Sequence, residues 1–172
     1  CIYPGIDPAF TPRKIRIGLN GKIYQTGRKR QWVLSELAWT MDLSPFKFIV
    51  LGRGWEIELS ALKIAGIDYQ YWDEPDYKEY PERVQSMDYY LATGFREGCG
   101  RGVQEAIACG VPVITMSTGV AADLGRHVTT YKSIEHLACI LEGIAQERKA
   151  RAALARDWTW DNYIAEHQQL FD

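Results

Sequence analysis

Short apolar segments alternate with helical segments along most of the chain, and this alternation constrains the fold more than any other feature. Strands that alternate with helices are typical of a parallel sheet covered on both faces. We therefore expect an α/β domain with a doubly wound, Rossmann-like parallel sheet. The predicted strands are residues 14–19, 46–51, 67–72, 88–92 and 111–116. The predicted helices are residues 29–41, 55–65, 102–109, 133–156 and 161–171, with a short helix or turn at 77–86.

Five loops follow the predicted strands, and they are rich in glycine, threonine and charged residues. Ligands of doubly wound sheets bind beyond the carboxyl ends of the strands. We therefore expect the functional site among these loops. They are residues 20–28, 52–55, 72–76, 93–101 and 117–121.

Composition excludes several classes of protein. The 172 residues are 47% hydrophobic and 24% charged, which predicts one soluble globular domain. No apolar run approaches the ~18 residues of a membrane span, no signal-peptide pattern opens the chain, and the net charge of -2 argues against a general nucleic-acid binder. The four cysteines form no C-x-x-C pair, and the three histidines have no partners at metal-ligand spacing. We expect a cytoplasmic protein without a metal.

The first residues are typical of a linker, because Pro4, Gly5 and Pro8 favour turns. We interpret residues 1–12 as the remnant of an interdomain linker, and the chain as part of a longer protein. A removed tag or ordinary processing is the alternative interpretation.

Charge is distributed unevenly. No acidic residue occurs from Pro8 to Ser35, whereas seven basic residues lie in the first thirty, and residues 68–88 are strongly acidic. A nearly neutral chain with a basic end suggests a local anion site. A solvated charged face is the alternative.

Two glycine loops are candidate phosphate sites. In residues 20–29, Lys22 and Arg28 can bracket a phosphate above a helix N-terminus, although the order of residues is not that of a P-loop. Gly52 and Gly54 end the second strand, where a phosphate contact and a simple turn are equally good interpretations. Ile57 stands where a dinucleotide fingerprint needs glycine, which disfavours a nicotinamide or flavin dehydrogenase.

The third candidate is the segment from Arg96 to Ile114. Glu97 lies in a loop that also contains Gly98, Gly100 and Gly102, and Glu105 lies in the helix that follows. Carboxylates accept hydrogen bonds from hydroxyl groups, and the amides of a helix N-terminus bind phosphate. Taken alone, the segment is equally consistent with a salt-bridged helix.

This segment resembles the donor-binding signature of retaining GT-B glycosyltransferases, the "glycosyl transferases group 1" that include glycogen synthase and sucrose synthase. The family pattern is E-[GS]-F-G-x-x-x-x-E-A-x-A-x-G-x-P-V-[IV], which residues 97–114 fit with Cys99 in place of phenylalanine. Further segments match in the right order, over essentially the whole chain. They are residues 4–7 (the hinge), 21–28 (the glycine and basic residues), 50–54 and 158–163.

The resemblance implies a role for each matching residue. The first glutamate of the family contacts the donor sugar, the second binds the nucleotide ribose, and a basic pair neutralises the diphosphate. The residues implied to be catalytic are Glu97, Lys22 and Arg28, with Lys29 as the alternative to Arg28 because the spacing is one residue long. The residues implied to bind the donor are Glu105, Gly21, Gly98, Cys99, Gly100, Arg101, Trp72 (the base), Gly52 and Thr118, which stands where the family often has a glycine pair.

The resemblance also implies a function. Residues 13–157 would bind a nucleotide-diphospho-sugar (UDP-, GDP- or ADP-sugar) for retaining transfer without metal, and residues 158–172 would form a helix that packs toward a missing N-terminal domain. That domain would bind the saccharide, lipid or protein acceptor, so the isolated chain would transfer poorly, and any peripheral membrane association would depend on it. A nucleotide-sugar epimerase of the same fold and a degenerate, non-catalytic scaffold domain are the alternatives.

Overall fold

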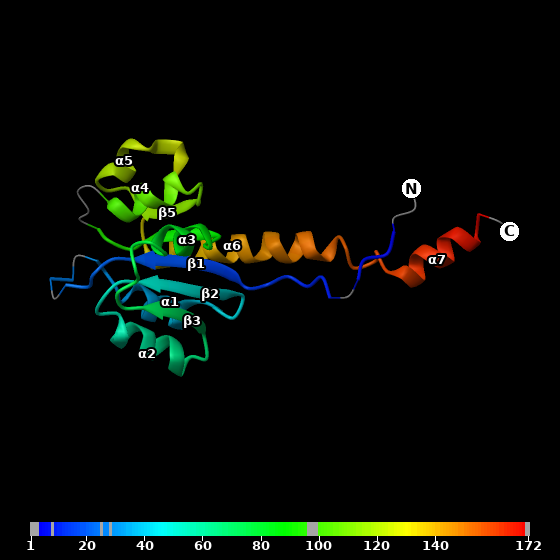
Figure 1. Ribbon diagram of the computed structural model, residues 1–172, viewed down its shortest axis with the longest axis horizontal. Coiled ribbons are helices and arrows are strands. Elements are labelled where there is room, and N and C mark those ends of the chain that lie inside the picture. The colour runs from blue at the N-terminus through cyan, green and yellow to red at the C-terminus, as the bar shows by residue number, and fades with distance from the viewer. Residues whose placement is uncertain (1–3, 8, 25, 28, 96–99, 171–172) are drawn as a thin grey trace. The chain divides into compact units, whose positions relative to one another are not determined.

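The computed structural model describes residues 4–7, 9–24, 26–27, 29–95 and 100–170 (Figure 1). The chain divides into two compact units, residues 14–140 and the two ends, residues 1–13 with 141–172. This division differs from the domain boundaries predicted at residues 12 and 157, which stay predictions. None of the helices described is both long and apolar enough to cross a membrane.

A six-stranded parallel sheet forms the centre of the 14–140 unit (Figure 1). Its order is β3-β2-β1-β4-β5-β6, so the direction of winding reverses between β1 and β4. The prediction of a doubly wound parallel sheet is confirmed. The strands are β1 (Ile15–Asn20), β2 (Phe46–Leu51), β3 (Asp68–Trp72), β4 (Tyr89–Ala92), β5 (Val113–Met116) and β6 (Thr129–Tyr131).

Helices connect consecutive strands, as a parallel sheet requires. Helices α3 and α4 pack on the sheet face that carries Ile49 and Leu51, and α1 packs against α2. The helices are α1 (Val33–Thr40), α2 (Glu56–Ile64), α3 (Tyr80–Gln85), α4 (Arg101–Ala108), α5 (Val120–Asp123), the 3-10 turn η1 (Gly125–His127), α6 (Ile134–Ala153) and α7 (Trp160–Gln168).

Strand β2, an inner strand of the sheet, is almost entirely buried. In β2, Phe46, Phe48, Ile49, Val50 and Leu51 are all at most 2% exposed. A strand buried on both faces carries a nearly continuous apolar run, and this pattern, interrupted only by Lys47, predicted β2 from residue 46 to residue 51. These rigid strands hold the loops at their carboxyl ends in fixed positions.

Three departures from the predicted elements have local causes. Helix α1 begins at Val33 instead of residue 29, because Arg30 adopts a left-handed conformation with φ of 45° and residues 31–32 form a turn. Strand β6 was not predicted, because it is an edge strand of three residues and too short to show a period. Helix α5, which has four residues, was not predicted either.

In the unit formed by the two ends, residues 4–7 run beside the segment that leads into α7. The Ile6 amide donates to the Trp158 carbonyl at 2.7 Å, and a side chain on Gly5 would meet the Trp160 backbone at 2.4 Å. Helix α7 begins after Thr159, whose hydroxyl accepts from the Asn162 amide at 3.1 Å. The N-terminal segment therefore depends on glycine for its close approach to α7.

Candidate functional site

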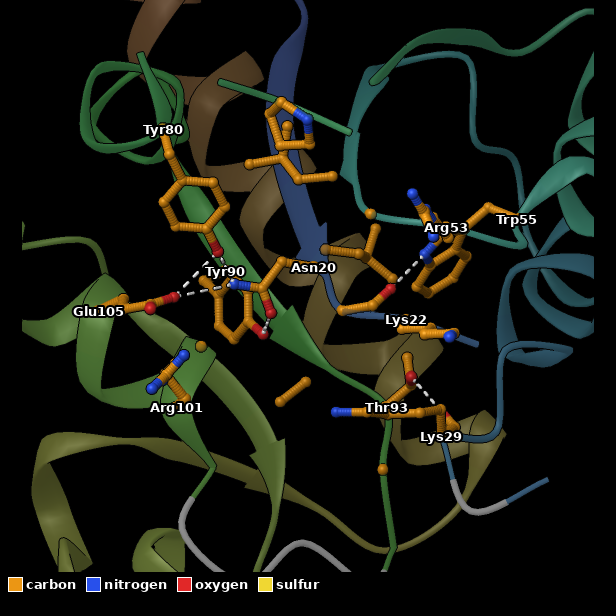
Figure 2. Close-up of a pocket in the computed structure, with 18 of the residues that line it drawn as sticks. Asn20, Lys22, Lys29, Arg53, Trp55, Tyr80, Tyr90, Thr93, Arg101 and Glu105 are labelled. Carbon is orange, nitrogen blue, oxygen red and sulfur yellow. Dashed lines mark hydrogen bonds between the residues drawn. The ribbon is translucent and has the colours of Figure 1, made fainter. Parts of the chain in front are cut away.

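A pocket of about 760 Å³ opens at the carboxyl ends of β1 and β4, where the strand order reverses (Figure 2). Its walls come from the ends of β1, β2 and β4, the loop after β3, and the start of α3 and α4. Doubly wound sheets bind ligands at this point, because the loops on either side diverge and leave a crevice. Four of the five loops expected from the sequence contribute lining residues, whereas residues 117–121 do not line the pocket.

Glu105 carries the carboxylate on one side of the pocket, and it is held by two donors (Figure 2). The Tyr80 hydroxyl donates to Glu105 Oε2 at 2.9 Å, and Asn20 Nδ2 donates to the same oxygen at 3.3 Å. Asn20 Nδ2 also contacts the Tyr80 hydroxyl oxygen, and the Tyr90 hydroxyl donates to Asn20 Oδ1 at 2.5 Å. We call Asn20, Tyr80, Tyr90 and Glu105 the carboxylate network.

The Tyr80 hydroxyl is a permanent donor in this network. Burial raises the pKa of Tyr80 well above its usual range, and the neighbouring Glu105 carboxylate raises it further. Both effects act in the same direction, because a phenolate is disfavoured away from water and beside a negative charge. Tyr80 therefore keeps its proton and directs it at Glu105 at any physiological pH.

Helix α4 begins beside the same pocket. Gly100 precedes its first turn with φ of 53°, a left-handed conformation that side chains rarely adopt. Arg101 is exposed at the first helical position, and the first turn contains no acidic residue. The unpaired amides and partial positive charge of a helix N-terminus make this wall of the pocket suited to an anion.

Basic side chains line the pocket across from Glu105 (Figure 2). Lys22 is exposed, with its ammonium 5.8 Å from the Tyr24 ring centroid. The Lys29 ammonium lies 3.3 Å from where a side chain on Gly21 would begin, and the Lys29 carbonyl accepts from Thr93. The pocket thus brings a carboxylate and two lysines into one cavity, with the helix terminus as a further positive group.

A buried tryptophan and two glycines fix the loop after β1. The Trp55 indole, 1% exposed, donates to the Gly21 carbonyl at 2.9 Å. A side chain on Gly52 would meet the same carbonyl oxygen at 2.7 Å, so the loops after β1 and β2 touch through their backbones. Trp55 and Gly52 therefore position the loop that carries Lys22.

Half of the predicted site residues meet in this pocket, namely Gly21, Lys22, Gly52, Gly100, Arg101 and Glu105. Lys29, the alternative basic residue, lines it as well. Four others, Arg28, Glu97, Gly98 and Cys99, lie outside the described residues. The roles of all ten stay predictions.

Two predicted residues, Trp72 and Thr118, are described but do not line this pocket. The Arg83 guanidinium lies over the Trp72 ring, 4.1 Å from its centroid, and Trp72 packs against the apolar core beneath α3 and α4. The Thr118 amide donates to the Met116 carbonyl at 2.8 Å in the turn between β5 and α5. A contact of either residue with a donor stays a prediction.

Sequence reasoning missed the residues that support Glu105. Asn20 begins the glycine-containing loop that was a candidate phosphate site, but no pattern indicated a hydrogen-bond partner for its side chain. Tyr80 lies in the acidic stretch of residues 68–88, and Tyr90 lies inside a predicted strand, where an aromatic residue needs no special explanation. The only signal was that Asn20 follows a strand, and Tyr90 lies in a strand, that were expected to end at the same sheet edge. Among the described residues, no three His, Cys, Asp or Glu side chains are placed to hold a metal ion.

Comparison with known proteins identifies the family. Residues 14–147 match the family described as "Glycosyl transferases group 1". No curated protein sequence matches the chain. The C-terminal domain of the group 1 glycosyl transferase LpcC from Francisella tularensis is 19% identical, with a TM-score of 0.64 over 96% of this chain and 95% of that one.

Two further solved structures have the same fold at similar identity. Anabaena Alr3699/HepE, solved with UDP and glucose, is 17% identical with a TM-score of 0.64 over 92% of this chain. This chain covers 48% of that protein, or about half its length. The catalytic domain of the cholesterol-α-glucosyltransferase from Helicobacter pylori is 15% identical, with a TM-score of 0.64 over 88% of this chain and 98% of that one. The chain belongs to the glycosyltransferase group 1 family, and its fold is the Rossmann-like fold of the C-terminal half of a GT-B glycosyltransferase.

Proposed function

We propose that the 14–140 unit binds the nucleotide-diphospho-sugar donor of a group 1 glycosyltransferase. The observation that carries the proposal is the placement of the Glu105 carboxylate, Lys22, Lys29 and the N-terminus of α4 around one pocket at the switch point of the sheet. A nucleotide-sugar combines hydroxyl groups, which carboxylates bind, with a diphosphate, which cations and helix termini bind. The Anabaena structure with UDP and glucose supports this choice of ligand.

In this proposal Glu105 binds ribose hydroxyls. Its carboxylate lines the pocket while donors from the protein hold one of its oxygens in place. A site built to pair with a hydroxyl group discriminates against a ligand that lacks it, because the half-buried carboxylate is then left without its partner. Ribonucleotides should therefore bind better than deoxyribonucleotides.

The diphosphate would lie between the lysines and the start of α4. Cleavage of the sugar–phosphate bond develops negative charge on the leaving diphosphate, and fixed cations stabilise that charge. Lys22 and Lys29 supply such cations, so transfer would proceed without a metal ion. We further propose the retaining reaction, in which Glu97 contacts the donor sugar and the other half of the full-length protein binds the acceptor.

A titration of thermal stability with UDP, GDP and ADP tests the proposal. The buffer contains EDTA, and the experiment is repeated with Mg²⁺. A nucleotide at roughly 100 times its Kd should raise the free energy of unfolding by about 2.7 kcal/mol, which is several degrees in Tm. A response that requires Mg²⁺ would contradict metal-independent binding.

Matched variants connect the response to the pocket. Glu105→Gln should weaken nucleotide binding by about tenfold or more, because the hydroxyl groups lose a charged acceptor. Glu82→Gln removes an exposed carboxylate from α3 outside the pocket lining and should leave the affinity unchanged. A wild-type protein that responds to none of the three nucleotides would contradict donor binding by this unit.

A further inference from the structure

We propose that Tyr80 is a positioning residue that, with Asn20, sets the orientation of the Glu105 carboxylate and thereby the recognition of a ligand hydroxyl group. This inference rests on the proposed function, because it concerns the same pocket. It adds a residue from α3, an element to which the sequence motifs assign no part in binding. It also assigns separate tasks to the two oxygens of Glu105.

The two groups that donate to Glu105 reach the same oxygen. Tyr80 and Asn20 donate to Glu105 Oε2, at 2.9 Å and 3.3 Å. A carboxylate oxygen accepts about two hydrogen bonds, so Oε2 is saturated by the protein. Within the described part of the chain, no hydrogen bond reaches Oε1. The network therefore presents Oε1 as the oxygen that accepts from a ligand.

The direction of each hydrogen bond in the network is fixed. Tyr90 carries a hydroxyl that donates to Asn20 Oδ1, which turns the amide so that Nδ2 faces Tyr80 and Glu105. Tyr80 accepts from this amide and must donate its own proton to Glu105. A chain of donors that runs from Tyr90 to Glu105 holds the carboxylate in one orientation before any ligand binds.

The network also joins four elements of the fold. Asn20 ends β1, Tyr80 begins α3, Tyr90 lies in β4, and Glu105 lies in the middle of α4. Rigid strands and helices place side chains more accurately than loops do. The carboxylate is thus oriented by side chains from β1, β4 and α3, at the point where the winding of the sheet reverses.

Tyr77 offers a matched control. Its ring stacks on Tyr80, with centroids 6.5 Å apart and planes 8° from parallel, and it also lines the pocket. Tyr77 is 82% exposed and makes no hydrogen bond to Glu105. Tyr80→Phe and Tyr77→Phe remove the same hydroxyl from neighbouring rings, but only the first removes a donor to Glu105.

The test compares a ribonucleoside diphosphate with its 2′-deoxy and 3′-deoxy forms, using whichever of UDP, GDP and ADP the wild type binds. We expect the wild type to prefer the ribose form, and Tyr80→Phe to bind that form about tenfold more weakly. Its affinity for the less favoured deoxy form should stay unchanged, so that the preference disappears. Tyr77→Phe should keep the wild-type preference.

The preference separates positioning from a general effect on the fold. A variant that merely loosens the pocket would weaken ribose and deoxyribose forms equally, and this outcome would overturn the proposal. A Tyr80→Phe variant that keeps the wild-type preference would also overturn it. Tyr80→Leu also lacks a hydroxyl group, so we expect it to lose the preference for the ribose form as Tyr80→Phe does.

A second readout needs no ligand. Crystal structures of the free wild type and of Tyr80→Phe should show Glu105 in one rotamer in the former and in more than one in the latter. An unchanged single rotamer would overturn the proposal. A wild type that binds no nucleoside diphosphate would contradict the proposed function instead, and the rotamers of Glu105 would still decide whether Tyr80 positions it.

Discussion

Gly102 lies so close to Asn20 that a Cβ atom at position 102 would be 2.2 Å from the Asn20 side-chain oxygen. It would be equally close to the hydroxyl oxygen of Tyr90. Position 102 therefore has no room for a Cβ atom and requires glycine, although helix propensity alone would favour alanine there. The contact brings the first turn of α4 directly against the carboxylate network.

We expect Gly102→Ala to lower the free energy of unfolding by about 1–3 kcal/mol, in spite of the better helix propensity of alanine. The methyl group must displace Asn20 and Tyr90, which breaks the hydrogen bond between them. Urea denaturation measures the change. Gly143→Ala is the matched control, because position 143 lies in α6 with nothing within 4 Å, and it should stabilise by about 0.5–1 kcal/mol. A stabilised Gly102→Ala variant would contradict the close contact.

Trp55→Phe should destabilise the protein by about 2–4 kcal/mol. The change leaves space around a residue that is 1% exposed and removes the donor to the Gly21 carbonyl. Trp39→Phe changes the same residue type at 89% exposure and should shift the free energy of unfolding by less than about 0.5 kcal/mol. Urea denaturation of both variants checks the prediction, and equal effects would contradict it.

Tyr131 should make the fold sensitive to alkali. Burial raises its pKa to about 12, although the nearby charge of Arg30 acts in the opposite direction. The usual pKa of tyrosine is about 10, so the folded state favours the neutral phenol. The resulting stability is fully present below about pH 10 and is lost as the pH rises toward about 12, by at most about 2–3 kcal/mol.

Unfolding in urea at about pH 8.5 and about pH 11.5 tests this dependence. Tyr131→Phe should lose less stability than the wild type between the two values, because phenylalanine has no proton to release. The pKa of Tyr80 is raised as well, so part of the dependence remains in that variant. Tyr77→Phe, at an exposed position, should behave as the wild type, and equal losses in all three proteins would contradict the prediction for Tyr131.

The fold could be predicted from the sequence where burial leaves a continuous pattern. Strand β2 matches its predicted bounds, because five of its six residues are apolar and buried, with only the half-buried Lys47 between them. Strand β6 could not be predicted, since three residues at the sheet edge show no period. The predicted start of α1 was wrong because Arg30 adopts a left-handed conformation, which is rare for a residue other than glycine and which no pattern in the sequence indicates.

The candidate site could be predicted only where the chemistry is local. Glu105 and the glycines belong to one segment, whose order of residues marks a loop and a helix N-terminus. The network around Glu105 depends on residues that meet only after folding, because Asn20 and Tyr80 come from separate elements. Asparagine is common in loops and tyrosine is common in short helices. The sequence therefore contains no pattern that indicates their contact with Glu105.

Lys22 and Lys29 should contribute to binding of the diphosphate and not to binding of the nucleoside. Lys22→Ala with Lys29→Ala removes both pocket ammonium groups, and we expect about tenfold or greater loss of affinity for a nucleoside diphosphate. Affinity for the corresponding nucleoside should not change, because it has no phosphate. Lys63→Ala removes an exposed lysine from α2, outside the pocket lining, and serves as the control. Isothermal titration calorimetry measures each affinity, and equal losses for nucleoside and nucleoside diphosphate would contradict a diphosphate site at these lysines.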